Sequence, residues 1–265
     1  MGRRRLDAEL VRRGLAGSEA EAQEAVRSGN VTVRGAPATK STTLVGSDEA
    51  LALAGPALPF VSRGGEKLAA ALDAFAIDPT GRDCLDAGAS TGGFTDCLLQ
   101  RGARHVVALD VGYGQLAWEL RTDPRVTVME KTNVRDLHPD LLPYRPSLVT
   151  ADLSFISLRL AAGPLVQAAE PLADLVFLIK PQFEAERDDV GRGGVVRDSA
   201  VWRRAIEEVA DATRAAGGAR SGLIVSPLKG PAGNVEFLLH ARTGAEARTL
   251  DIDGAIEAAG KLGNS

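Results

Sequence analysis

Short apolar runs alternate with stretches of helical periodicity through most of this chain, and this alternation limits the fold more than any other feature. Seven apolar runs are predicted to be β-strands, at residues 84–86, 105–110, 126–130, 148–152, 175–180, 223–226 and 237–241. Four helical stretches lie between them, at residues 67–76, 94–101, 157–169 and 199–216. This order predicts an α/β fold with a mostly parallel sheet and helices on both faces. The short connection at 227–235 suits a hairpin, so one strand is expected to be antiparallel.

A smaller module of different charge precedes this alternating region. Residues 1–46 carry eight basic and five acidic side chains, a net charge of +3, whereas the whole chain carries −4, which leaves −7 for the remainder. Two short helices, the second opened by a capping box of Ser18 and Glu21, and strands at 31–33, 43–45 and 51–53 predict a small basic α+β domain. We therefore divide the chain into a domain at 1–58, a linker at 59–62, a larger domain at 63–250 and a C-terminal tail at 251–265.

Composition excludes several classes of protein. The chain has 265 residues, of which 45% are apolar and 25% charged, so it is long enough to bury a core without disulfides or metals. Cys84 and Cys97 are too few for a disulfide framework and belong to no metal-binding pattern. No secretion signal and no apolar run of about 18 residues occurs. The sequence predicts a soluble cytoplasmic protein without a membrane segment or a metal site.

A glycine-rich segment after the first strand of the larger domain is the strongest indication of a ligand. It runs from Asp86 to Phe94, and Asp110 ends the next strand. Small residues let the backbone approach a ligand, the following helix offers free N–H groups, and a carboxylate at Asp110 can accept ribose hydroxyls. The dinucleotide and P-loop patterns are absent, and Asp86 would repel a pyrophosphate, which favours S-adenosylmethionine over NAD. The alternative is a tight turn without a ligand. The candidate cofactor residues are Asp86, Gly88, Ala89, Ser90, Thr91, Gly92, Gly93, Phe94 and Asp110.

Four charged residues lie at the ends of predicted elements. Lys67 opens a helix, Asp152 and Lys180 end neighbouring apolar strands, and Glu236 begins the last strand. Ligands of open α/β sheets bind at the carboxyl ends of the parallel strands, so these groups are expected to share one edge with the glycine-rich segment. A lysine that closes an apolar strand must be paired or desolvated. The alternative is that all four are ordinary capping or surface charges.

Several segments together resemble the TlyA family. They are residues 60–68, 86–95, 110–116, 151–157 and 180–184. The family consists of ribosomal RNA ribose 2′-O-methyltransferases with an FtsJ-like catalytic domain, so the resemblance implies a Rossmann-like methyltransferase sheet. In the basic module, residues 5–7 and 29–33 resemble the alpha-L RNA-binding motif shared with a small-subunit ribosomal protein and pseudouridine synthases.

The resemblance implies a role for each candidate residue. It places a catalytic tetrad on Lys67, Asp152, Lys180 and Glu236, the cofactor loop on residues 86–93 and the ribose-binding acid on Asp110. It also places Asn133 beside the adenine of S-adenosylmethionine, and Asp152 belongs to both sets. The implied reaction methylates a cytidine ribose in ribosomal RNA of the large subunit and, as a second expectation, of the small subunit. Lys180 is expected to be the base, with its pKa lowered by desolvation and by Lys67.

RNA binding is expected to involve both domains. A cluster of arginines suits backbone phosphates, although such a cluster at a terminus is often only a solvated charged end. The glycine-rich segment at 187–197, with Arg187 and Arg192, is expected to close over the target nucleotide. Trp118 and Trp202 are at helical spacing and are expected to be packing residues. The candidate RNA-binding residues are Arg3, Arg4, Arg5, Arg12 and Arg13.

Three other functions stay open at this point. The first is an RNA-binding protein with an inactive methyltransferase fold. The second is a haemolysin, a name that members of the family have carried. The third is an NAD-dependent enzyme, which the loop pattern disfavours.

Overall fold

The computed structural model describes residues 3–27, 29–53, 59–191 and 193–263. Residues 54–58, which the sequence analysis placed at the end of the first domain, lie outside these ranges. The chain divides into two compact units, Met1–Ser62 and Arg63–Ser265, and each is described separately.

The first unit is a small α+β domain. Its strands are β1 (Arg4–Arg5), β2 (Val31–Val33), β3 (Ala36–Pro37), β4 (Leu44–Val45) and β5 (Leu51–Leu53), and its helices are α1 (Leu6–Arg12) and α2 (Glu19–Arg27). Strand β1 pairs with β4, while β2 lies between β3 and β5. The core includes Leu6 and Leu10 of α1 and Val26 of α2. Ser18 Oγ accepts the Glu21 N–H at 3.2 Å, as the predicted capping box requires.

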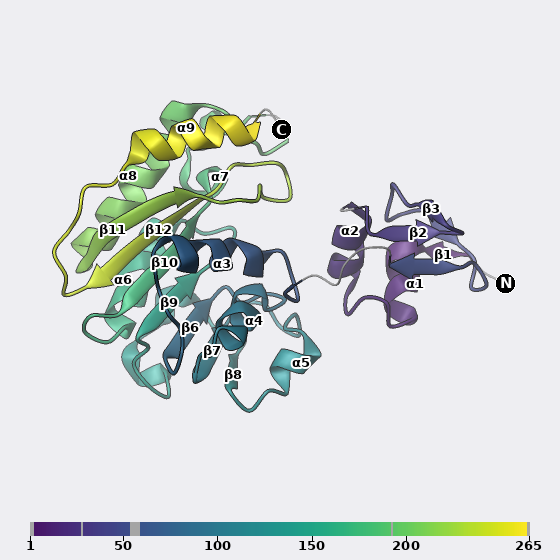
Figure 1. The fold of residues 1–265 in the computed structure, drawn as a ribbon, viewed down its shortest axis with the longest axis horizontal. Coiled ribbons are helices and arrows are strands. Elements are labelled where there is room, and N and C mark those ends of the chain that lie inside the picture. The colour runs from purple at the N-terminus through teal and green to yellow at the C-terminus, as the bar shows by residue number, and fades with distance from the viewer. Residues whose placement is uncertain (1–2, 28, 54–58, 192, 264–265) are drawn as a thin grey trace. The chain divides into compact units, whose positions relative to one another are not determined.

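The second unit is built on a seven-stranded sheet in the order β11-β12-β10-β9-β6-β7-β8 (Figure 1). The strands are β6 (Asp83–Ala87), β7 (His105–Leu109), β8 (Val126–Met129), β9 (Leu148–Ala151), β10 (Asp174–Ile179), β11 (Gly218–Val225) and β12 (Phe237–Thr243). Strand β12 is antiparallel to both of its neighbours, β10 and β11, and it forms a hairpin with β11. The predicted α/β sheet with one antiparallel strand is confirmed.

Helices cover the sheet in two groups. Helices α3 (Gly64–Ala74) and α4 (Gly93–Gln100) pack together, as do α6 (Leu158–Ala168) and α8 (Ser199–Ala215). Figure 1 shows α3 and α4 in front of the sheet. The connections also contain α5 (Trp118–Arg121), α7 (Pro181–Glu184) and three 3₁₀ turns, at Val134–Asp136, Pro139–Leu141 and Arg187–Asp189. None of these short elements was predicted, because four residues are too few to show a period.

The residues set aside as a C-terminal tail contain α9 (Ile252–Gly263), which packs against α8 and β11. Ala255 and Ala259 are buried, and Ile252 and Ile256 pack beside the main core. These four positions follow the i, i+3, i+4, i+7 spacing of an amphipathic helix. The small alanine side chains made that spacing hard to recognise in the sequence.

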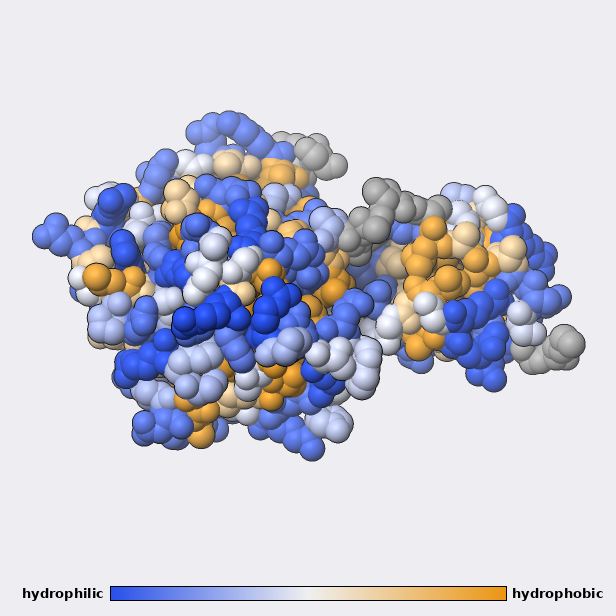
Figure 2. All heavy atoms as spheres, turned by 60° about the horizontal axis from the view of Figure 1, so that its bottom comes forward, coloured by the Kyte–Doolittle hydropathy of each residue, from blue (hydrophilic) through white to orange (hydrophobic). Residues whose placement is uncertain are grey.

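The surface of the second unit is mixed in polarity. Figure 2 shows its apolar areas separated by hydrophilic side chains on the face in view. Within the described ranges, no helix is long and apolar enough to cross a membrane. Nor does the described part of the chain contain three or more His, Cys, Asp or Glu side chains grouped to hold a metal ion.

Candidate active site

Lys67 and Glu236 form a buried ion pair at one edge of the sheet. Lys67 belongs to the first turns of α3, and its Nζ lies 2.5 Å from Glu236 Oε2. The Lys67 side chain is 8% exposed and that of Glu236 only 1%. Burial raises the pKa of Glu236, and the positive charge of Lys67 opposes this shift. Two charges removed from water in this way are stable only as partners.

Asp152 and Lys180 form a second pair next to the first. Asp152 follows β9, Lys180 follows β10, and these parallel strands are neighbours in the sheet. Lys180 Nζ lies 2.5 Å from Asp152 Oδ1 and donates to Ser154 Oγ at 3.0 Å. The sequence-based expectation that Lys180 must be paired is therefore confirmed.

The antiparallel strand brings the two pairs together. Ile179 at the end of β10 is opposite Phe237 at the start of β12, so the register places Glu236 beside Lys180. The charges of Lys180 and Asp152 also act on the pKa of Glu236, the first lowering it and the second raising it. All four predicted tetrad residues thus meet at one edge. Glu236 Oε1 is buried and has no hydrogen-bond partner among the described residues. This oxygen can therefore accept a hydrogen bond from a ligand.

The glycine-rich loop lies against the strand end that carries Asp152. The Asp152 N–H donates to the Ala87 carbonyl at 2.9 Å. Gly88 has φ +84°, and a Cβ at this position would lie 2.5 Å from the Asp152 carbonyl oxygen. Only glycine permits this backbone conformation and this close approach. The predicted cofactor loop and the charged cluster are consequently one continuous site.

Asp110 connects the glycine-rich loop to the next loop along the sheet edge. Its Oδ2 accepts the Ser90 N–H at 2.8 Å, and its Oδ1 accepts the Gly112 N–H at 2.6 Å. Asn133 lies at the N-terminus of a 3₁₀ turn, where its Oδ1 accepts the Arg135 N–H at 3.0 Å. Both predicted cofactor residues therefore have a structural role, and their contact with a cofactor stays a prediction.

Asp86 has a different environment from the one expected of an acid that faces a ligand. Its carboxylate is fully buried below the loop, where Thr95 donates to Oδ2 at 2.7 Å and Thr150 Oγ1 lies 3.3 Å from Oδ1. Burial raises the pKa of Asp86 to about 7. The Thr150 hydroxyl lies at the same distance, 3.3 Å, from the Leu85 carbonyl. The sequence placed Asp86 correctly at the strand tip but could not show its burial.

The arginines predicted to bind RNA differ in their surroundings. Arg13 uses four of its five N–H donors inside the domain, on Glu9 and on the carbonyls of residues 46, 47 and 49. Its side chain is 21% exposed, so Arg13 is mainly a structural residue that fixes the 46–49 loop.

Three of the other arginines pair with carboxylates, and their side chains remain 46% to 61% exposed. Arg5 binds Asp7, and Arg12 binds Glu9, each through two hydrogen bonds. The Arg5 contact holds the pKa of Asp7 at about 2, and the Arg12 and Arg13 contacts do the same for Glu9. Arg3 lies 3.5 Å from Glu49. Arg4 is exposed and makes no ion pair with the described residues.

The prediction that both tryptophans are packing residues is confirmed for one of them and wrong for the other. Trp202 is buried, and its indole N–H donates to the Val196 carbonyl at 3.1 Å, which confirms it as a packing residue. Trp118 is 76% exposed, so the expectation of packing was wrong. It begins the short helix α5, in which Leu120 is the buried residue.

An exposed aromatic residue next to the charged cluster was missed. Phe155 is 92% exposed and has φ +64°, a left-handed conformation that is costly for a bulky side chain. Its ring lies 5.3 Å from the ring of Phe183, over which Lys180 Nζ is placed at 5.8 Å. Phe155 lies in the segment 151–157 that resembles the family. The exposure of its ring and its backbone conformation can be seen only in the structure.

The segment expected to close over the target is anchored at its base. Gly191 and Val195 form a β-bridge, while Asn234 donates to the Gly194 carbonyl at 2.8 Å and accepts the Val196 N–H at 2.9 Å. Asn234 is buried and precedes Glu236 by two residues. Arg192 lies outside the described residues. Any closure of this segment must therefore pivot on a fixed base, and the closure stays a prediction.

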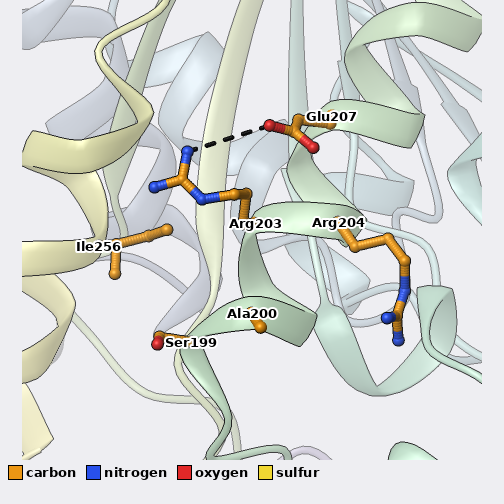
Figure 3. Close-up of a pocket in the computed structure, with 6 residues that line it drawn as sticks. All are labelled: Ser199, Ala200, Arg203, Arg204, Glu207 and Ile256. Carbon is orange, nitrogen blue, oxygen red and sulfur yellow. Dashed lines mark ion pairs between the residues drawn. The ribbon is translucent and has the colours of Figure 1, made fainter.

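The structure also has a surface pocket of about 420 Å³ away from the charged cluster (Figure 3). It lies between α8 and α9, where Arg203 of α8 pairs with Glu207 of the same helix and with Asp253 of α9. None of the predicted site residues lines this pocket, so its volume does not identify the active site. The lining residues are Ser199, Ala200, Arg203, Arg204, Glu207 and Ile256.

Comparison with known families agrees with this geometry. Residues 60–243 match the family described as FtsJ-like methyltransferase, and residues 4–49 match the S4 domain. The fold and site thus define a methyltransferase joined to an S4 domain. A Mycobacterium tuberculosis protein, 16S/23S rRNA (cytidine-2′-O)-methyltransferase TlyA, is 52% identical and covers 97% of this chain and 96% of its own length. The chain belongs to the TlyA family of FtsJ-like methyltransferases.

Other relatives carry a different name. Hemolysin A of Brachyspira hyodysenteriae is 38% identical over 89% of this chain and 98% of its own length. A solved structure from Streptococcus thermophilus, which its name assigns provisionally to the hemolysins, is 37% identical with a TM-score of 0.80. It covers 99% of this chain and 97% of its own.

The raised pKa of Asp86 predicts how Asp86→Asn changes stability with pH. The ordinary pKa is 3.8, so between about pH 4 and pH 7 the unfolded chain releases a proton that the folded protein keeps. The free energy of unfolding of the wild type therefore falls through this range by up to about 1.4 kcal/mol per pH unit, and Asn removes this loss. The free energy of unfolding should be measured for both proteins from pH 4 to 8.5. The value for Asp86→Asn relative to the wild type should increase up to about pH 7 and then stay constant.

Asp174→Asn is the matched control for Asp86→Asn. Burial would raise the pKa of Asp174, but contacts from His240 and Arg82 lower it below its ordinary value. The Asp174 carboxylate stabilises the fold above about pH 4 and loses that effect on acidification. The free energy of unfolding of Asp174→Asn should therefore fall furthest below that of the wild type at high pH. A stability difference for Asp86→Asn that is independent of pH would contradict the assigned titration.

Proposed function

We propose that this protein transfers a methyl group from S-adenosylmethionine to the 2′-hydroxyl of a cytidine ribose in ribosomal RNA. The observation that supports this most is the meeting of the Lys67–Glu236 and Lys180–Asp152 pairs beside the glycine-rich loop. The M. tuberculosis relative is named for this transfer to both 16S and 23S RNA. We propose large-subunit RNA as substrate, with small-subunit RNA as a second, and therefore a place in the cytoplasm with the ribosomes.

The segment from β6 to α4 fits the proposed cofactor in its donors and acceptors. Gly92 caps α4 without a side-chain hydrogen bond, so backbone N–H groups remain at the start of that helix. Asp110 would accept the ribose hydroxyls, and the amide of Asn133 would bind the adenine. We propose that residues 88–94, with Asp110, Asn133 and Asp152, hold S-adenosylmethionine, which would supply a methyl group on a positively charged sulfur. Asp86 is fully buried and bonds to Thr95 of α4, so its role is to support the loop and not to contact the cofactor.

The charged cluster would handle the proton of the ribose hydroxyl. This hydroxyl is a very weak acid, so its oxygen needs a base nearby as it forms the new bond. In this proposal Lys180 acts in its neutral form: its Nζ accepts the proton, and Asp152 stabilises the ammonium group that results. Glu236 neutralises Lys67, and its free Oε1 can accept a hydrogen bond from the substrate. Holding the oxygen in line supplies much of the remaining acceleration.

The first unit would bind RNA through its exposed arginines. Arg3, Arg4, Arg5 and Arg12 are all exposed and can meet backbone phosphates, which position a substrate without reading its sequence. Arg13 is excluded from this group because its donors are occupied.

Lys180→Ala tests the assigned base. Because the amine is the proposed proton acceptor, methyl transfer to ribosomal subunits should fall by about 100-fold or more. Calorimetry should find S-adenosylmethionine binding within about threefold of the wild type, since Lys180 is not among the proposed cofactor residues. Transfer is measured with labelled cofactor, and the 2′-O-methylated nucleotide is identified by mass spectrometry.

The matched control is Lys261→Ala, an exposed lysine of α9 that should leave the rate unchanged. Retained turnover in Lys180→Ala would refute the assigned base. Binding of ribosomal RNA by a wild-type protein that transfers no methyl group would support the non-catalytic alternative. Lysis of red cells or leakage of liposomes would instead support a hemolysin.

Phe155→Ala tests a stacking role for the exposed ring. A ring that stands free beside the cluster can stack on a base displaced next to the target ribose, and stacking contributes about 1–3 kcal/mol per base. The substitution should raise KM for RNA by about 5- to 150-fold, while Phe155→Tyr should stay near the wild type. Leu160→Ala, another exposed apolar residue, is the control. An unchanged KM for RNA would exclude this role.

Arg4→Ala and Arg13→Ala separate RNA binding from folding. Arg4→Ala should leave stability within about 0.5 kcal/mol and reduce the salt slope of ribosomal RNA binding by about one. Arg13→Ala removes the anchor of the 46–49 loop and a partner of buried Glu9, which should cost about 1–3 kcal/mol. Hydrogen exchange of α1 amides in the full chain and filter binding measure the two effects. Equal stability of both variants would contradict the structural role of Arg13.

A further inference from the structure

Glu184 connects the two loops that follow the strands carrying Asp152 and Lys180. It is the last residue of α7, and its side chain is buried. Its Oε2 accepts the Ser157 hydroxyl at 2.5 Å, and its Oε1 accepts the Leu158 N–H at 2.8 Å. Ser157 and Leu158 form the start of α6, which follows the Asp152 loop.

The start of α6 is capped from two elements. Ser157 Oγ accepts the Arg159 N–H at 3.1 Å, which is an ordinary cap from the preceding residue. The Leu158 N–H is satisfied by Glu184 instead, a residue 26 positions later in the chain. Arg159 returns a hydrogen bond to the Glu184 carbonyl at 3.2 Å and pairs with Glu208 at 2.8 Å. The ends of α6 and α7 are therefore fixed to each other.

Each of the two loops is held at both ends. At one end, the Lys180–Asp152 pair and the Lys180–Ser154 hydrogen bond join them. At the other end, Glu184 joins Ser157 and Leu158, and the rings of Phe155 and Phe183 lie 5.3 Å apart between these points. Without the Glu184 carboxylate, the contacts to Ser157 and Leu158 would be lost, and only the Arg159 hydrogen bond to the Glu184 carbonyl would remain at this end. The orientation of Lys180 toward Asp152 then depends on a carboxylate that does not touch either residue.

We propose that Glu184 is a positioning residue for methyl transfer, which keeps the Asp152 loop and the Lys180 segment in register. This inference rests on the proposed function, because its kinetic test needs a methyl-transfer assay. It adds a requirement that the tetrad does not contain. A misplacement of about 1 Å at reacting groups costs about 100-fold in rate, so a buried contact one helical turn beyond Lys180 is enough to control it.

The experiment compares Glu184→Ala and Glu184→Gln with Asp174→Ala and Asp174→Asn in the full chain. Asp174 is the matched control, because it is a half-buried carboxylate at the opposite end of β10 with two polar partners, Arg82 and His240. Glu184→Ala should lower kcat by about 10- to 100-fold and leave KM for RNA and cofactor affinity within about twofold. Asp174→Ala should lower the melting temperature at least as much and leave kcat within about twofold.

Glu184→Gln tests whether an amide can replace the carboxylate and restore kcat. Gln at position 184 can still accept the Leu158 N–H and can donate to Ser157 Oγ, so Glu184→Gln should recover most of kcat. The pH dependence of kcat should shift in Glu184→Ala and not in Asp174→Ala, since only the first changes the surroundings of Lys180. A wild-type kcat in Glu184→Ala, or a rate loss that Asp174→Ala reproduces, would overturn the proposal.

A second measurement is independent of activity. The rate at which an amine-reactive reagent labels Lys180, followed by mass spectrometry, should change severalfold in Glu184→Ala and stay constant in Asp174→Ala. A wild type that methylates no ribosomal RNA would refute the proposed function, and this labelling would then decide on Glu184 alone. Labelling of Lys180 that is the same in all variants would overturn the positioning role whatever the activity.

Discussion

Two lysine–carboxylate pairs that meet at one edge of a sheet, one of them buried and the other partly exposed, impose the main constraint on this structure. Removing a charge from water costs several kcal/mol, and the loss of one partner from a buried pair destabilises a protein by about 3–5 kcal/mol. Lys67 and Glu236 lie 169 positions apart in the chain, so the whole second unit must fold before the pair can form. The sheet supplies the geometry that makes such a pairing possible.

Strand order explains how the four groups reach the same place. The carboxyl ends of β9 and β10 are neighbours because the strands are parallel and adjacent, and they deliver Asp152 and Lys180. A residue that begins a strand could not join them if all strands were parallel. Because β12 runs antiparallel to β10, its first end lies at that same edge, and Glu236 arrives beside Lys180. The single reversed strand is thus a requirement of the site as well as a feature of the fold.

The sequence predicted the parts of this arrangement that depend on pattern. Apolar runs and helical spacing located all seven strands of the sheet, and the short 227–235 connection predicted that one strand is antiparallel, without showing which one. Residue type and position at strand ends were enough to select Lys67, Asp152, Lys180 and Glu236. The failures concern burial and partners, which a pattern does not contain.

Particular residues show why those failures arose. Asp86 and Asp110 both end strands, yet only Asp86 is fully buried beneath the loop. Arg4 and Arg13 are equivalent in a count of charges, but Arg13 is occupied by carbonyls of a loop more than 30 positions away. Trp118 was placed on a packing face because its helix was not known to be four residues long. In each case a distant segment or an element boundary decided the outcome.

The direction of pKa shifts distinguishes stabilising carboxylates from those at the site. Arginine contacts lower the pKa of Asp7 and Glu9 to about 2, and contacts from His240 and Arg82 lower that of half-buried Asp174 in spite of its burial. Burial raises the pKa of Asp86, Glu184 and Glu236, and the nearby cations Arg159, Lys67 and Lys180 oppose this shift only in part for the last two acids. These three acids gather around the edge that also bears the strained, exposed Phe155. Features that oppose stability persist where a function requires them, and their concentration at this edge is physical evidence for its role that is independent of any sequence resemblance.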